Sequence, residues 1–305
     1  MNKSTSVMLK GLACIIVLMC HFKITNIFST CGYLAVGIFY FFSGYGLAYC
    51  TLHKKNYIDT FLVKKFIHIF VPFYIIYFVY DCICDGGVSI KNFVYIFNPF
   101  NPCEYLWYVK SIIYIYIYYF IIYKILEKIS GNVIDKIGRL GVLVWILAGI
   151  SMITFTTDPN RFLSLGFIVG WYFAIKEEKV IGFFKNKYWL IIVEFVLIIA
   201  FHLTAYYLYN NIGLYILSQY MGPTLCGIMC YTIAVNFEFD NKCLLGLGMI
   251  SYEMYLAHPV MLKVCEKFST IKYLVGMYVG SVLIAIVLYF FVSIIDKKAK
   301  KQFNY

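Results

Sequence analysis

The chain has 305 residues, of which 62% are hydrophobic, 20% are aromatic and only 13% are charged, with a formal net charge of +11. A soluble domain is closer to half apolar and a quarter charged, so this composition excludes a water-soluble globule. The basic residues stand mostly in short segments between apolar runs, which is typical of membrane topology and of contact with anionic lipids. We therefore do not expect the chain to bind nucleic acid.

Apolar runs follow one another along the whole chain, and about 20 such residues suffice to span a bilayer as a helix. The runs are continuous rather than alternating, which favours helices over the strands of a barrel. We predict an all-α integral membrane protein, a bundle of about ten transmembrane helices in a single multi-pass domain over residues 1–305, with no appended soluble domain. The predicted spans are 7–27, 32–51, 66–84, 105–123, 140–156, 162–176, 188–208, 213–235, 244–263 and 273–295.

The lysines and arginines between these spans orient the chain. With the N-terminus inside, the inner segments hold about threefold more of them than the outer segments do. The positive-inside rule then predicts that both termini are cytoplasmic and that the protein is a multi-pass component of the cell membrane. Contact with membrane lipids follows from the same composition.

The first predicted span carries two polar side chains, Lys10 and His21, in a nearly pure hydrocarbon run. They stand eleven positions apart, and eleven steps of about 100° bring a helix back to within roughly 20° of its starting direction. Both therefore share one face, about 16 Å apart along the axis. Ionisable groups inside a membrane helix are costly and point to function by default.

The predicted topology separates the polar groups by depth. Lys10, Lys65 and His68 lie toward the cytoplasmic side, with Lys64 beside them, and His21, His258 and Glu253 lie in the outer half or near the middle. The basic inner group is either ordinary flanking charge or a phosphate-binding mouth, since ammonium groups act as point-charge partners for phosphates. A histidine kept neutral by its apolar surroundings is suited to take a proton from a hydroxyl, which we expect of His21.

The cysteines predict no metal site. The spacing of Cys82 and Cys84 is too short for a zinc-type pair, and Cys226 and Cys230 share a helix face without partner ligands. Most other cysteines fall within apolar runs, where cysteine behaves as a small hydrophobic residue.

Six short segments combine these polar residues with glycines and aromatics. In chain order they are Lys10-Gly11-Leu12-Ala13 with His21; Phe39-Tyr40-Phe41-Phe42-Ser43-Gly44-Tyr45; Lys65-Phe66-Ile67-His68 with Pro72; Leu106-Trp107-Tyr108; Arg161 with Gly166 and Gly170; and Leu247-Gly248-Met249-Ile250-Ser251-Tyr252 with Tyr255-Leu256-Ala257-His258-Pro259. In this order and spacing they resemble the membrane-bound acyltransferase 3 family, which includes polysaccharide and lipopolysaccharide O-acetyltransferases. The resemblance extends over nearly the whole chain.

The resemblance implies an enzyme that takes an acyl group, commonly acetyl, from cytoplasmic acyl-CoA and passes it to a sugar hydroxyl of a cell-surface or lipid-linked glycan. It implies no bound cofactor; acyl-CoA is the donor substrate. His21 and Lys10 are then the expected catalytic residues, and Lys65, His68 and Lys10 bind the donor. Side chains expected to shape the site are those of Ser43, Tyr45, Trp107, Arg161, Glu253 and His258.

Two positions depart from the pattern of the family. It usually has arginine where this chain has Lys10 and again where it has His68, and lysine keeps the charge but loses the bidentate fork. The alternative function is a membrane transporter that moves acyl groups or glycan lipids without chemistry. Transporters often show internal repeats, and none is visible here. The oligomeric state and the acceptor sugar are not predicted by the sequence.

Overall fold

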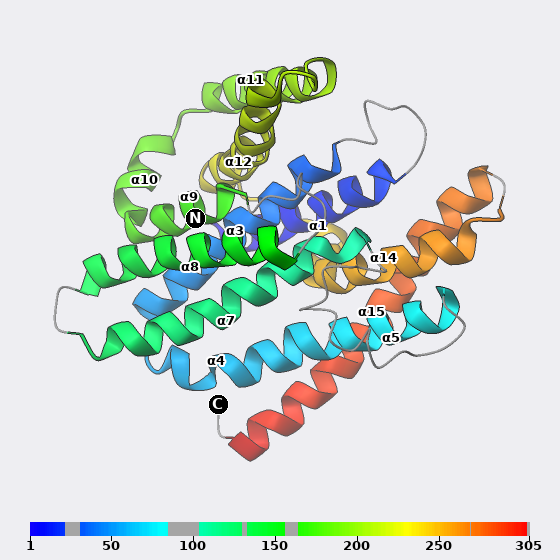
Figure 1. The fold of residues 1–305 in the computed structure, drawn as a ribbon, viewed down its shortest axis with the longest axis horizontal. Helices are drawn as coiled ribbons and strands as arrows, with labels where there is room; N and C mark the ends of the chain where they lie inside the picture. The colour runs from blue at the N-terminus through cyan, green and yellow to red at the C-terminus, as the bar shows by residue number, and fades with distance from the viewer. Residues whose placement is uncertain (22–30, 85–103, 130–132, 156–163, 269, 304–305) are drawn as a thin grey trace. The chain divides into compact units, whose positions relative to one another are not determined.

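The structure is a computed structural model, which describes residues 1–21, 31–84, 104–129, 133–155, 164–268 and 270–303. Every regular element in these ranges is a helix (Figure 1). Seven helices or helix runs are long and apolar enough to cross a membrane. They are α1 (Lys3–Cys20), α3 (Gly32–His53), α4 (Tyr57–Lys65) continued by a π-helical turn η1 (Phe66–Phe70) and α5 (Val71–Cys84), α7 (Trp107–Glu127), α8 (Val133–Phe155), α11 (Trp189–Tyr207) and α15 (Thr270–Phe303).

The all-helical membrane fold is therefore confirmed, whereas the count of about ten spans and the side on which the termini lie stay predictions. Three of the ten predicted spans have no counterpart among these seven membrane-grade helices of the described residues. The run 162–176 yields only a short helix, α9 (Gly166–Ile175). The run 213–235 forms α12 (Ile212–Asn236), which is less apolar because it includes polar residues and Pro223.

The third difference is a break in the predicted span 244–263. The chain forms α13 (Lys242–Met249) and then α14 (Ser251–Cys265), with Ile250 between them. The remaining helices are short: the 3₁₀ turn η3 (Glu104–Leu106) and α10 (Glu177–Phe184).

The chain forms two compact units. The first unit consists of 1–54, 131–145 and 163–249, and the second of 55–130, 146–162 and 250–305. The change from the first to the second unit near the C-terminal end coincides with the break at Ile250. Each unit is described by itself below.

In the first unit, glycines let α3 and α9 approach backbone to backbone. A Cβ atom on Gly44 would overlap the carbonyl group of Phe167, and one on Gly170 would overlap the carbonyl group of Phe41. Small residues at such crossings are the usual way in which membrane helices pack closely. Gly44 and Gly170 belong to two of the segments that carry the family resemblance, so part of that pattern has a packing role.

The N-terminal helix is fixed at its start. The side chain of Asn2 accepts a hydrogen bond from the amide of Thr5 at 3.1 Å and caps α1. The Thr5 hydroxyl donates to the carbonyl of Phe237 at 3.2 Å and accepts from the amide of Phe239 at 3.3 Å. The first turn of α1 is therefore bound to the segment that follows α12.

The second unit packs through aromatic rings and an α14–α15 pair. Phe61 of α4 lies between Tyr116 and Tyr119 of α7, with ring centroids 5.8 Å and 4.7 Å away. A Cβ atom on Gly280 of α15 would overlap the Met261 side chain of α14. Such aromatic pairs add contact energy to the packing of α4 against α7.

Candidate functional site

Lys10 and His21 both belong to α1, in the first unit. The helix is unbroken from Lys3 to Cys20, and His21 is its C-cap, whose amide donates to the carbonyl of Leu18 at 3.2 Å. Within the described residues the helix ends at Cys20, where the backbone of His21 (φ −82°, ψ −3°) closes the last turn. The rest of the predicted span 7–27 lies outside the described ranges. The rise from Lys10 to His21 is about 16 Å at 1.5 Å per residue.

The stretch of α1 around Lys10 lies against α13. A Cβ atom on Gly11 would come 2.7 Å from the amide nitrogen of Gly248, and one on Gly248 would overlap the carbonyl group of Val7. The opening and closing segments of the resemblance thus touch through their glycines. This contact fixes α1 directly beside Lys10.

Ser43 and Tyr45 lie on α3, also in the first unit. The hydroxyl of Tyr45 donates to a carboxylate oxygen of Glu177, the first residue of α10. Its ring stacks on Tyr49 with centroids 6.0 Å apart and leans on Tyr231 at 5.8 Å. Tyr45 therefore ties α3 to the start of α10.

Lys65 and His68 belong to the second unit, where they contact different helices. The Nζ atom of Lys65 lies 4.1 Å from the ring centroid of Tyr116, in a cation–π geometry with α7. The Nε2 atom of His68 lies 3.2 Å from Oδ1 of Asp296 on α15. The π-helical turn Phe66–Phe70 holds His68, and such turns are frequent at functional sites.

Asp296 is a residue of this site that the sequence did not predict. Its side chain is only 10% exposed, and its second oxygen, Oδ2, accepts a charged hydrogen bond from Lys300 at 2.6 Å. Beside it, Ile67 packs with Val292 and Ala299. The signal in the sequence was a single acidic residue at the end of the last apolar run, four positions before a lysine, which by itself reads as an ordinary helix-surface pair.

The closing segment meets the same π-helical turn inside the second unit. The hydroxyl of Tyr252, at the start of α14, donates to the carbonyl of Ile69 at 2.9 Å. The next residue, Glu253, is buried, and its Oε2 atom has no hydrogen-bond partner among the described residues. A buried carboxylate oxygen without a donor is costly unless the group is neutral or meets a ligand.

His258 is fully buried on α14. Its Nδ1 atom donates to the carbonyl of Tyr255, and the rings of Tyr255 and Tyr105 lie 5.1 Å and 6.1 Å from its own. The hydroxyl of Tyr255 donates to the carbonyl of Tyr105 at 2.7 Å, just before Trp107 begins α7. His258 and Trp107 are thus parts of a tyrosine-rich junction between α14 and the start of α7.

The predicted site residues fall into two sets. Lys10, His21, Ser43 and Tyr45 belong to the first unit, and Lys65, His68, Trp107, Glu253 and His258 belong to the second. Two predicted groups each combine residues of both units and stay predictions. They are the inner group of Lys10 with Lys65 and His68, and the outer pair of His21 with His258. Arg161 lies outside the described residues.

No cluster of three or more histidine, cysteine or acidic side chains that could hold a metal ion occurs in the described part of the chain.

Comparison with known proteins identifies the family. The acyltransferase 3 family model, described as an acyltransferase domain, matches residues 8–295, which is almost the whole chain. Neither the curated proteins nor the solved structures gave a significant match. Together with the seven membrane-grade helices, the match over 8–295 shows that this chain belongs to the acyltransferase 3 family and is a multi-pass membrane acyltransferase.

Proposed function

We propose that the protein is an O-acyltransferase, most simply an O-acetyltransferase, of the cell membrane. It takes the acyl group from cytoplasmic acyl-CoA and transfers it to a sugar hydroxyl of a cell-surface or lipid-linked glycan. The observation that best supports this function is the single unbroken helix that carries Lys10 and ends at His21. With both termini in the cytoplasm, Lys10 lies toward the side where acyl-CoA is made, and His21 lies about 16 Å farther across the membrane.

The reaction assigns the proton and the leaving group as follows. The neutral imidazole of His21 accepts the proton of the sugar hydroxyl while the hydroxyl oxygen attacks the thioester carbonyl of the acyl donor. The new ester C–O bond forms, the C–S bond breaks, and the coenzyme A thiolate leaves and takes up a proton. Such general-base assistance contributes typically about 10²–10⁴-fold to a rate.

The donor phosphates are assigned to basic side chains. Lys10 and Lys65 supply ammonium groups, which bind phosphate as point charges, and the imidazole of His68 adds a third polar group. The contact of His68 with Asp296 at 3.2 Å orients the imidazole ring. The proposed binding role of His68 falls at a position where the family usually has arginine.

The remaining predicted residues shape the site. Tyr45 ties α3 to α10, and Glu253 and His258 lie buried on α14. Ser43 on α3 and Trp107 at the start of α7 are half-buried and are proposed members of the same site. Arg161 is retained as a proposed member from the resemblance alone. Metal ions have no part in the proposed reaction.

A genetic experiment tests this function. Surface glycans from a strain that lacks the gene are compared by NMR with those of the parent strain, and we expect the O-acyl signals to disappear. Re-expression of the wild-type chain should restore them, and the His21→Ala chain should not. A matched control is His53→Ala, since His53 is an exposed histidine at the end of α3. Unchanged O-acylation in the deletion strain would contradict the proposal and favour transport without chemistry.

A further inference from the structure

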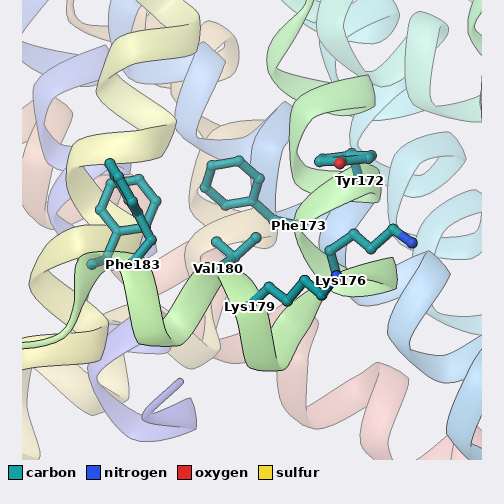
Figure 2. A pocket seen from close by; sticks show the side chains of 7 residues that line it. Tyr172, Phe173, Lys176, Lys179, Val180 and Phe183 are labelled. Carbon is teal, nitrogen blue, oxygen red and sulfur yellow. The ribbon is translucent and has the colours of Figure 1, made fainter.

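A small pocket lies in the first unit where α9 ends and α10 begins (Figure 2). Its volume is about 360 Å³, within the usual range of small-molecule sites. It is lined by Tyr172, Phe173, Lys176, Lys179, Val180, Phe183 and Phe184. None of these residues belongs to the site proposed for acyl transfer.

The inner wall of the pocket is fixed. The rings of Phe173 and Phe184 lie 5.7 Å apart, and both pack on the buried ring of Tyr231 at 5.1 Å and 5.8 Å. At the junction, the amide of Lys176 still donates to the carbonyl of Tyr172, and α10 begins one residue later. The pocket is therefore a preformed feature of the helix junction.

The outer wall is apolar and exposed. Tyr172 and Phe183 are each 56% exposed, although both are large aromatic side chains. In Figure 2, the Phe183 ring lies on one side of the pocket and the two lysine side chains lie on the opposite side, with Val180 between them. One occupant would therefore meet hydrocarbon on one side and positive charge on the other.

The positive charge is not neutralised by the carboxylates that the structure describes. Neither Lys176 nor Lys179 forms an ion pair within the described residues, and the neighbouring Glu177 accepts a hydrogen bond from Tyr45. The ammonium group of Lys187 lies over the Phe183 ring, 3.8 Å from its centroid, and is not one of the two lysines that line the pocket. Lysine ammonium groups so arranged suit a phosphate.

The position of the pocket along the chain indicates that the phosphate belongs to a lipid headgroup. Lys176 directly follows the short apolar helix α9, and in the predicted topology the positive-inside rule assigns both lysines to the cytoplasmic leaflet. That leaflet is rich in anionic phospholipids, and basic pockets beside membrane helices on this side bind their headgroups. The exposed aromatic rings would then lie against acyl chains, where Tyr and Phe are at little cost.

We propose that this pocket binds an anionic phospholipid of the cytoplasmic leaflet. The lipid phosphate contacts Lys176 and Lys179, and the glycerol and the upper acyl chains pack on Val180, Phe183 and Tyr172. The site is separate from acyl transfer, so the proposal stands whether or not the chain acylates glycans.

The experiment measures lipid binding by the full-length chain. Phosphatidylglycerol or phosphatidylcholine is titrated into detergent-solubilised protein, and bound lipid is counted by native mass spectrometry. We expect wild type to prefer phosphatidylglycerol. The Lys176→Gln/Lys179→Gln chain should bind it more weakly, by about fivefold for each lysine, since one lysine near an anionic surface contributes about 1 kcal/mol.

Two matched variants make the test specific. Lys54→Gln/Lys55→Gln removes two exposed lysines elsewhere and should leave binding unchanged. Lys176→Arg/Lys179→Arg keeps the charge and should retain phosphatidylglycerol. Equal binding by wild type and the glutamine variant would overturn the proposal, as would loss of binding in the arginine variant. Displacement of phosphatidylglycerol by acetyl-CoA or ADP at equimolar concentration would also overturn it, because the pocket would then be a nucleotide site.

Discussion

Gly11 of α1 and Gly248 of α13 meet backbone to backbone, although 236 positions of sequence lie between them. Neither position has room for a side chain: a Cβ on Gly11 would lie 2.7 Å from the amide nitrogen of Gly248. The contact is immediately next to Lys10, so the segment that opens the family pattern is positioned by the segment that closes it. A glycine pair of this kind is how membrane helices approach without large side chains between them.

The first prediction concerns this glycine contact. Gly11→Ala should lower the stability of the folded chain by about 1–3 kcal/mol, the usual cost of forcing extra volume into a closely packed interface. The measurement is the thermal unfolding midpoint of the protein in detergent. Gly46→Ala is the control, because a Cβ at Gly46 would meet nothing within 4 Å. Equal midpoints for the Gly11 and Gly46 variants would contradict the account of this contact.

The second prediction concerns Asp296, which holds His68 and Lys300. Asp296→Asn removes the carboxylate that contacts the His68 imidazole at 3.2 Å while keeping a similar shape. If His68 binds donor phosphate, the KM for acyl-CoA should rise about fivefold with little change in kcat, which corresponds to about 1 kcal/mol for a half-exposed partner. Steady-state kinetics with purified protein measure both constants.

A control for Asp296 is available in an exposed ion pair. Lys124 and Glu127 lie 3.1 Å apart, and both side chains are largely exposed, so Glu127→Gln should change neither constant. A fall in kcat with an unchanged KM for Asp296→Asn would show that Asp296 does not act through donor binding.

The third prediction tests the link between α14 and the π-helical turn. Tyr252→Phe removes the hydrogen bond to the carbonyl of Ile69 and should destabilise the chain by about 0.5–1.5 kcal/mol. Thermal unfolding again provides the measurement. Tyr289→Phe on α15 serves as a comparison and should have no effect, since no hydrogen bond of its hydroxyl occurs within the described residues. A Tyr252→Phe chain as stable as wild type would show that this hydrogen bond does not stabilise the fold.

The helical membrane fold could be predicted because it depends on composition and on runs of apolar residues, which the sequence displays directly. The break at Ile250 could not be predicted, because a hydropathy window of about 20 residues averages over the few polar residues near it, Ser251 and Glu253, and shows no interruption. The start of α9 could not be predicted either, because residues 162–165 continue into the helix without a change in apolar character, although α9 begins only at Gly166.

The candidate site was predictable only in part. The spacing of Lys10 and His21 is a property of one helix, so the sequence was sufficient to place them on it. Asp296 was missed because its partner His68 lies on another helix, and a contact between distant segments leaves no mark on either segment alone. The π-helical turn at Phe66–Phe70 was missed because a run of bulky apolar residues continues an α-helix equally well in sequence.

The most direct test of the central claim is acetyl transfer by purified protein in which His21 is replaced. Release of free coenzyme A and acetylation of a glycan acceptor are measured with acetyl-CoA for wild type, His21→Ala and the control His53→Ala. We predict that His21→Ala loses about 10²–10⁴-fold in kcat, while His53→Ala stays at the wild-type rate and both variants unfold at the wild-type temperature. Transfer by a folded His21→Ala chain at the wild-type rate would contradict the claim that α1 carries the catalytic base.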